Sequence, residues 1–129
     1  MKVTPLLVTT TALLLSAATT AATYTVSPDE DSCWDPPNWC VEAQANWSEH
    51  TQGKLVVTYT NVCQHRVYLR KCNARKDGTE DCGAGGLSGG RSTKWSTTNA
   101  SGEYNYNFVG VLNGSKDWVC TGKVPNWRD

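Results

Sequence analysis

The sequence predicts an all-β fold: a small antiparallel sandwich or barrel of about six to seven strands, stapled by three disulfides. Three observations support this prediction. Apolar and polar residues alternate in several short segments, turn residues such as glycine and asparagine separate these segments, and six cysteines are spread along the chain. Evenly spaced short strands joined by turns are typical of sandwiches and small barrels.

Each segment with a strand pattern is expected to pair with an antiparallel neighbour. Residues 41–47 alternate apolar and polar side chains, which is the pattern of a half-buried strand, although Ala, Glu and Gln also suit a helix. Residues 54–62 are rich in Leu, Val, Thr and Tyr, which favour strands. The expected strands, in chain order, are residues 41–47, 54–62, 66–72, 92–98, 104–111 and 118–121.

A hairpin is expected after the third of these strands. Asp77-Gly78 is a pair typical of a two-residue turn, because both central residues need a positive φ. This turn places Cys72 and Cys82 within one position of direct opposition. The glycine-rich stretch 83–90 that follows predicts a flexible loop.

The first 22 residues have the pattern of a secretion signal. Lys2 gives a positive start, residues 6–18 form an uncharged run of apolar and small residues, and residues 20–22 offer small side chains to a signal peptidase. A membrane anchor is the alternative, but a spanning helix needs about 20 apolar residues, and this run is shorter and interrupted by threonines. We therefore expect residues 1–22 to be removed and the mature protein to be secreted or periplasmic, without a membrane span.

The six cysteines lie beyond this signal. An even number in an exported chain predicts disulfides. Structural zinc sites usually contain cysteines about two to four residues apart, whereas the closest pair here is wider, so neither a metal nor a cofactor is expected. Six cysteines allow several connectivities; the one we predict is Cys72–Cys82 across the hairpin, Cys33–Cys40 around a proline loop, and Cys63–Cys120 as the remaining pair.

After the signal, the chain divides into an arm and one domain. Residues 23–40 are expected to form an irregular acidic arm, because residues 27–31 are polar and Pro36-Pro37 excludes a helix or central strand. Residues 41–129 are expected to form a single β domain.

Charge is balanced overall but unevenly distributed. The chain has 12 basic and 12 acidic residues, so its formal net charge is zero. Residues 23–53 carry only acidic charges and residues 54–94 mostly basic ones. Non-specific nucleic-acid binding needs a dominant basic field, so no nucleic-acid partner is expected. The acidic arm is expected either to face the basic hairpin or to be simply solvated.

Two catalytic signatures occur in the glycine-rich stretch, and we reject both. Residues 86–90 match G-x-S-x-G, but a nucleophile elbow needs a strand, a turn and a helix in an α/β sheet. Residues 85–92 nearly match a phosphate-binding loop, which needs a similar setting. His50 and His65 fall in expected turns, and although Asp77 or Glu49 could orient them, nothing in the spacing points to it. We therefore expect no catalytic residues and no enzymatic activity.

Six tryptophans stand out in a chain of this length. Trp47, Trp95 and Trp118 fall in expected strands and are assigned to the core. Trp34 and Trp39 lie between Cys33 and Cys40, in a loop too short to bury both rings. They are expected either to lie flat across one end of the sandwich or to project as binding residues, and Trp127 could cover the same end.

These observations favour an exported, non-catalytic binding module. The leading hypothesis is recognition of a glycan or cell-wall polymer by Trp34, Trp39 and Trp127, since projecting aromatic rings suit stacking and anchoring. The alternative is a protein-directed ligand, such as an enzyme inhibitor or effector, that binds an extracellular or periplasmic protein. That alternative uses the same loop or the basic residues of the hairpin region, Arg66, Arg70, Arg75 and Lys76.

Overall fold

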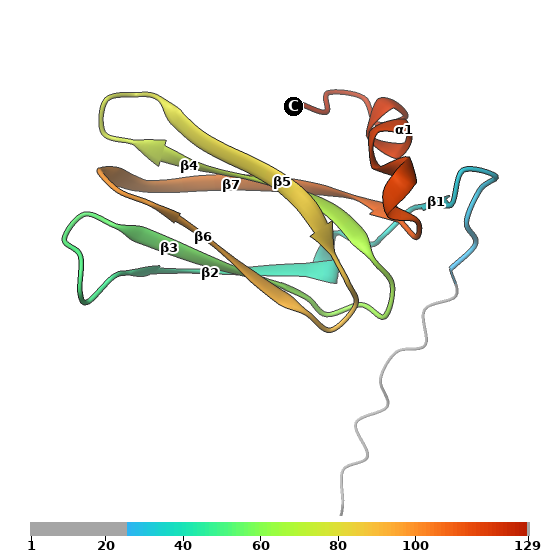
Figure 1. Cartoon of the computed structure of the whole chain (residues 1–129), viewed down its shortest axis with the longest axis horizontal. Coiled ribbons are helices and arrows are strands. Elements are labelled where there is room, and N and C mark those ends of the chain that lie inside the picture. The colour runs from blue at the N-terminus through green and yellow to red at the C-terminus, as the bar shows by residue number, and fades with distance from the viewer. Residues whose placement is uncertain (1–25, 129) are drawn as a thin grey trace, which may run out of the picture.

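The computed structural model describes residues 26–128 and confirms a sandwich of two antiparallel sheets (Figure 1). One sheet has four strands in the order β1-β7-β4-β5, and the other has three in the order β2-β3-β6. The expected signal, residues 1–22, lies outside the described residues. Within residues 26–128, no helix is long and apolar enough to cross a membrane.

The elements follow the chain in simple order. The strands are β1 (Cys33–Trp34), β2 (Val41–Trp47), β3 (Leu55–Asn61), β4 (Val67–Arg75), β5 (Glu80–Leu87), β6 (Ser92–Thr97) and β7 (Ala100–Val111). The helical segments are η1 (Asn38–Cys40), η2 (Gly114–Lys116) and α1 (Asp117–Gly122). The expected arm is therefore not wholly irregular, because it contains β1 and η1.

The main core lies between the two sheets. Alternate residues of β3 point inward, and Leu55, Val57 and Tyr59 are almost fully buried. Val67 and Leu69 of β4 meet them from the opposite sheet. Burying side chains of this size stabilises the fold by about 1.5–3 kcal/mol each, so the alternation seen in the sequence accounts for this core.

Most of the glycine-rich stretch 83–90 is a strand, not the expected loop, and only residues 88–90 lie in the turn that follows. β5 (Glu80–Leu87) pairs with β4 along its whole length. Two of its glycines leave room for large side chains: the ring of Trp95 lies where a Cβ of Gly83 would stand, and the guanidinium of Arg66 lies where a Cβ of Gly86 would stand. Glycine in this strand thus marks close approach by neighbours rather than mobility.

The β4–β5 turn is one residue longer than expected. The backbone N–H of Arg75 donates to Thr79 O, so three residues form the loop, and Gly78 takes the positive φ of 85°. This shift by one residue places Cys72 directly opposite Cys82. The predicted Cys72–Cys82 disulfide is confirmed.

The other two predicted disulfides are wrong, because the chain between Cys33 and Cys40 passes from one sheet to the other. Cys33 lies in β1, which pairs with β7, and the helix that follows β7 brings Cys120 to it. Cys40 precedes β2, whose partner β3 ends just before Cys63. The observed bridges are therefore Cys33–Cys120 and Cys40–Cys63.

A second, smaller core covers part of the outer face of the four-stranded sheet. Residues 117–122 form α1 instead of the expected last strand, and Asn113 caps the preceding turn by accepting from the Ser115 N–H. Figure 1 shows α1 on the outer side of this sheet. Beneath it, Val109, Val111 and Cys120 pack together, and Cys33, Tyr68 and Trp127 pack against them.

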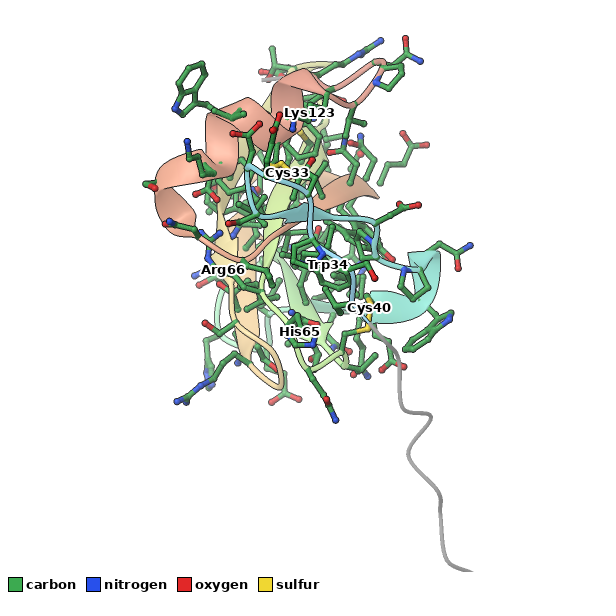
Figure 2. The ribbon with its side chains drawn as sticks, turned by 90° about the vertical axis from the view of Figure 1, so that its right-hand side faces the viewer. Cys33, Trp34, Cys40, His65, Arg66 and Lys123 are labelled. Carbon is green, nitrogen blue, oxygen red and sulfur yellow. A yellow bond between two sulfur atoms is a disulfide. The ribbon has the colours of Figure 1, made fainter. Side chains whose placement is uncertain are left out.

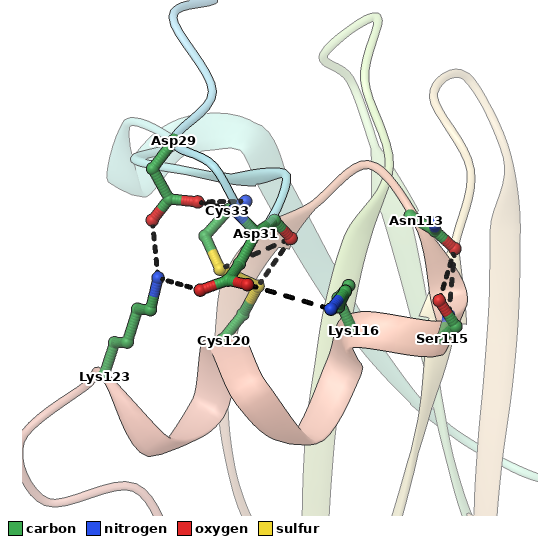
Figure 3. Close-up of polar contacts among 8 residues, drawn as sticks. All are labelled: Asp29, Asp31, Cys33, Asn113, Ser115, Lys116, Cys120 and Lys123. Atoms are coloured by element: carbon green, nitrogen blue, oxygen red, sulfur yellow. Dashed lines mark hydrogen bonds and ion pairs between the residues drawn. A yellow bond between two sulfur atoms is a disulfide. The ribbon is translucent and has the colours of Figure 1, made fainter.

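The acidic arm faces the C-terminal segment, not the basic hairpin (Figure 3). Lys123 Nζ lies 2.8 Å from Asp29 Oδ2 and 2.8 Å from Asp31 Oδ2. Lys116 Nζ lies 3.7 Å from the other oxygen of Asp31. The hydrogen bond from Lys123, followed by that from the Cys33 N–H, lowers the pKa of Asp29. These contacts surround the Cys33–Cys120 bridge and hold the arm against α1.

Candidate functional site

Trp34 lies in the core, so of the two alternatives expected for it, packing and projection as a binding residue, the structure shows packing. Its side chain is 6% exposed. Its indole N–H donates to Arg66 O at 2.8 Å, and its ring meets His65 edge to face at 5.9 Å between centroids (Figure 2). The ring also occupies the space where a Cβ of Gly110 would stand. Trp34 therefore joins β1 to the sheet and is not available to a partner.

Trp39 is the loop tryptophan that reaches solvent. It lies in η1 and is 49% exposed. The backbone on both sides is fixed: Pro37 precedes the 3-10 turn and accepts from the Cys40 N–H at 3.0 Å, and the Cys40–Cys63 bridge ties the turn to the end of β3. A ring on such a support loses little conformational freedom when a ligand binds.

A shallow groove of about 720 Å³ begins at Trp39 and extends along the edge strand β2. The outward positions of β2 and β3 supply its polar wall, because side chains alternate between the two faces of a strand. The polar lining residues are Asn38, Glu42, Gln44, Thr58 and Thr60. Val41, Ala43 and Tyr106 complete the groove, and the Tyr106 hydroxyl donates to Val41 O at 3.4 Å.

The groove offers an aromatic ring together with both donors and acceptors. Within the part of the chain that the structure describes, the side chains of Asn38, Glu42 and Gln44 form no hydrogen bond with the protein. Among the lining residues, Glu42 is the one charged group. Such a surface is suited to an uncharged ligand that has a flat apolar face and several hydroxyl groups.

The remaining residues proposed for binding are dispersed. Trp127 stacks on Tyr68 at 6.0 Å on the outer face of the four-stranded sheet, so it does not join Trp39. Arg66 forms a two-point ion pair with Asp117, at 2.6 and 3.0 Å. Arg75 pairs with Asp81, and Lys76 lies exposed at the hairpin turn.

Arg70 is the exception among the basic residues, because it is buried on the four-stranded sheet. The structure thus does not bring Arg66, Arg70, Arg75 and Lys76 together as one binding surface.

Two tryptophans assigned to the core are exposed. Trp47 is 53% exposed at the end of β2, where its ring lies against Gly102, near the start of β7. Trp118 belongs to α1 and not to the expected strand. It lies on the side of α1 away from the sheet and is 77% exposed. Trp95 does pack against the core, and its indole N–H donates to Asp81 O at 2.9 Å.

The polar wall of the groove was missed by the sequence prediction. Glu42 and Gln44 were treated only as the polar half of an alternating pattern, and Thr58 and Thr60 only as residues that favour a strand. A signal was available: once β2 and β3 are paired, residues 42 and 44 lie opposite 60 and 58 on the same face. The position of Trp39 beside them depends on η1, which the sequence did not predict.

The described residues contain one group with metal-ligand geometry, formed by Cys72, Glu80 and Cys82. Both sulfur atoms are joined in a disulfide, so this group is not a thiolate site.

Comparisons with known proteins assign the chain to no family. No protein-family model and no curated protein matches the chain. Among solved structures, a DUF1425 family member from Shewanella sp. pv-4 is similar over 70% of this chain and 99% of its own, with 8% sequence identity and a TM-score of 0.36. A likeness at this level carries no argument about fold or function.

Proposed function

We propose that this protein is an exported, non-catalytic binding module that recognises a neutral glycan in the groove beside Trp39. The observation that carries the proposal is the half-exposed indole ring at the end of a polar groove. The apolar face of a sugar ring stacks on the indole, and its hydroxyl groups bond to the amide, carboxylate and hydroxyl groups of β2 and β3. Neutral glycans fit because Glu42 is the one charge in the lining.

The lining also supports binding without hydrolysis. Glycoside hydrolysis usually requires a pair of carboxyl groups on either side of the scissile bond. The groove has a single carboxylate, that of Glu42. The three disulfides support an exported protein, because such bonds persist in oxidising compartments such as the extracellular space or the periplasm.

A second candidate function is binding to a protein through the edge of β2. The Cys40 carbonyl accepts from the Val62 N–H, so the backbone N–H and C=O groups of the even-numbered residues of β2 point towards β3. Because ladder bonds alternate along an antiparallel pair, the N–H and C=O groups of Val41, Ala43 and Ala45 face away from β3. Tyr106 contacts one of these carbonyls. A partner strand could pair with the others, as in recognition by strand addition.

Tryptophan fluorescence titrated with neutral polysaccharides, such as glucans, mannans and chitin oligomers, tests the glycan proposal. A central tryptophan in a binding site typically contributes about 2 kcal/mol or more, so Trp39→Ala is expected to weaken binding by at least about tenfold. Trp118→Ala is the matched control, because it removes a more exposed ring from the opposite side of the molecule. Equal affinity of Trp39→Ala and wild type would overturn the proposal.

The same experiment separates the two candidates. Ala45→Pro removes an outward N–H from β2 without removing a bond to β3, so it blocks strand addition. Glycan binding is expected to survive this change. A protein ligand lost on Ala45→Pro, with no response to any polysaccharide, would favour the second function instead.

A further inference from the structure

Arg70 occupies an unusual position on the outer face of the four-stranded sheet. It lies in the middle of β4, between Ala84 of β5 and Asn107 of β7. Although arginine is normally a surface residue, this one is only 9% exposed.

The guanidinium of Arg70 has no anionic partner among residues 26–128. Its one hydrogen bond goes from Nη2 to the Cys82 sulfur at 3.5 Å, and its Nε–H is buried without a partner. The Oδ1 atom of Asn107, on the neighbouring strand, is also buried without a partner. Glu80 of the neighbouring strand β5 forms no ion pair with Arg70. A buried charge without a direct ion pair destabilises a fold, so these two groups indicate a role outside folding.

Both residues line a cavity of about 250 Å³. Its charged lining groups are the guanidinium groups of Arg70 and Arg128 and the carboxylate of Glu80, so the net charge is positive. The carboxylate of Glu80 already accepts from Asn105 Nδ2 at 3.4 Å. The amides supply donors and acceptors. The lining residues are Arg70, Glu80, Asn105, Tyr106, Asn107, Asn126 and Arg128.

We propose that this cavity binds a sugar acid, one uronic-acid unit, with its carboxylate on Arg70 and Arg128 and its hydroxyl groups on the asparagine amides. Arginine matches a carboxylate because its N–H groups form a planar fork. The unpaired Asn107 oxygen needs a donor, which a hydroxyl group supplies and a simple anion does not. The volume is below the range of about 300–1,000 Å³ for drug-sized ligands, so it fits a single ring.

This site is separate from the groove beside Trp39, which lies on the other sheet. Its lining residues come from β4, β5, β7 and the C-terminal segment, and except for Tyr106 none of them lines the groove. The two sites also differ in charge, since the groove has no basic residue in its lining.

Thermal unfolding with and without ligand tests the proposal. Glucuronate and galacturonate are expected to raise the Tm of wild-type protein, whereas glucose, galactose, acetate and inorganic phosphate at the same concentration leave it unchanged. Without ligand, Arg70→Met is expected to raise the Tm, because it replaces an unpaired buried charge with an apolar side chain of similar length. The variant should then show no further rise with uronate.

Two other variants make the test independent of that substitution. Arg128→Gln, at the rim, is expected to weaken uronate affinity at least threefold in calorimetric titration without changing the fold. Trp39→Ala is the control and should bind uronate as wild type does. The proposal is overturned if uronate and the neutral sugar shift the Tm equally, if uronate gives no shift, or if Arg70→Met lowers the Tm of the free protein.

Discussion

The two outer faces of the sandwich differ in what covers them. The three-stranded sheet presents hydroxyl, amide and charged side chains to solvent, with Trp39 at one end. The four-stranded sheet presents Val109 and Val111 at one end, covered by α1 and the C-terminal segment, and Arg70 further along. Sheet faces with apolar outward residues need a cover, whereas polar ones can remain open.

This difference separates stability from recognition. The cover adds a second core and a disulfide to the four-stranded sheet, so substitutions there are expected to change the free energy of unfolding. The open face of the three-stranded sheet contributes little packing, so substitutions there are expected to change ligand affinity alone. Four predictions test this separation.

The largest expected effect is removal of the bridge that holds the cover. Replacing Cys33 and Cys120 by Ser opens a loop of 87 positions, for which the chain-entropy relation gives a loss of about 4–5 kcal/mol. Removing Cys72–Cys82, with a separation of 10, gives about 3 kcal/mol on the same relation. Denaturant unfolding measures both. Equal losses for the two pairs would contradict the expected order.

Two tryptophan substitutions are expected to have opposite effects, one on stability and the other on glycan affinity. Trp127→Ala removes a ring packed on Tyr68, and is expected to lower the free energy of unfolding by about 2 kcal/mol without changing glycan affinity. Trp39→Ala is expected to weaken glycan binding without changing the free energy of unfolding. Denaturant unfolding combined with fluorescence titration gives both quantities for each variant. A variant that loses both properties would show that the faces are coupled.

Between the sheets, Lys71 is expected to weaken the fold. It is 8% exposed, its Nζ lies 5.4 Å from the centre of the Trp95 ring, and burial lowers its pKa. Lys71→Met is therefore expected to raise the Tm by a few degrees at pH 7. Because the unfolded state holds the proton up to about pH 10.5, stability of the wild type rises with pH towards that value. The advantage of Lys71→Met should therefore shrink as the pH rises towards 10.5.

The smallest effect is expected at the exposed ion pairs of Lys123. Its contact lowers the pKa of Asp29, so the stabilisation is present above the ordinary value of 3.8 and is lost as pH falls below it. Lys123→Met should consequently lose less stability than wild type between pH 5 and pH 3. High salt should reduce the difference in unfolding free energy between wild type and Lys123→Met at pH 5. If this difference changes with neither pH nor salt, the ion-pair explanation is excluded.

Local patterns predicted the fold where pairing partners are near in sequence. Residues 41–47 and 54–62 alternate and form β2 and β3, and the hairpin brought Cys72 and Cys82 together as expected. Prediction failed where distant segments meet. Cys33 meets Cys120 because β1 pairs with β7, and residues 83–90 are largely a strand because Trp95 and Arg66 use the space above their glycines.

The candidate site was predicted in part for the same reason. The sequence left packing and projection open for both tryptophans of the proline loop. The structure exposes Trp39 and holds Trp34 in the core by contacts with His65 and Arg66. Arg70 was grouped with other basic residues near the hairpin. Its separation from them follows from strand register, which places it beside Asn107 of β7.

The Cys33–Cys120 bridge also has a mechanical consequence. Tension applied to residues 26 and 128 passes through the sulfur–sulfur bond, so the strands between the two cysteines carry none of it. In single-molecule pulling, only the short segments outside the bridge would extend, and unfolding after reduction of all three bridges would release about 300 Å of further chain. A molecule tethered at one end and pulled at the other therefore keeps its groove intact under load.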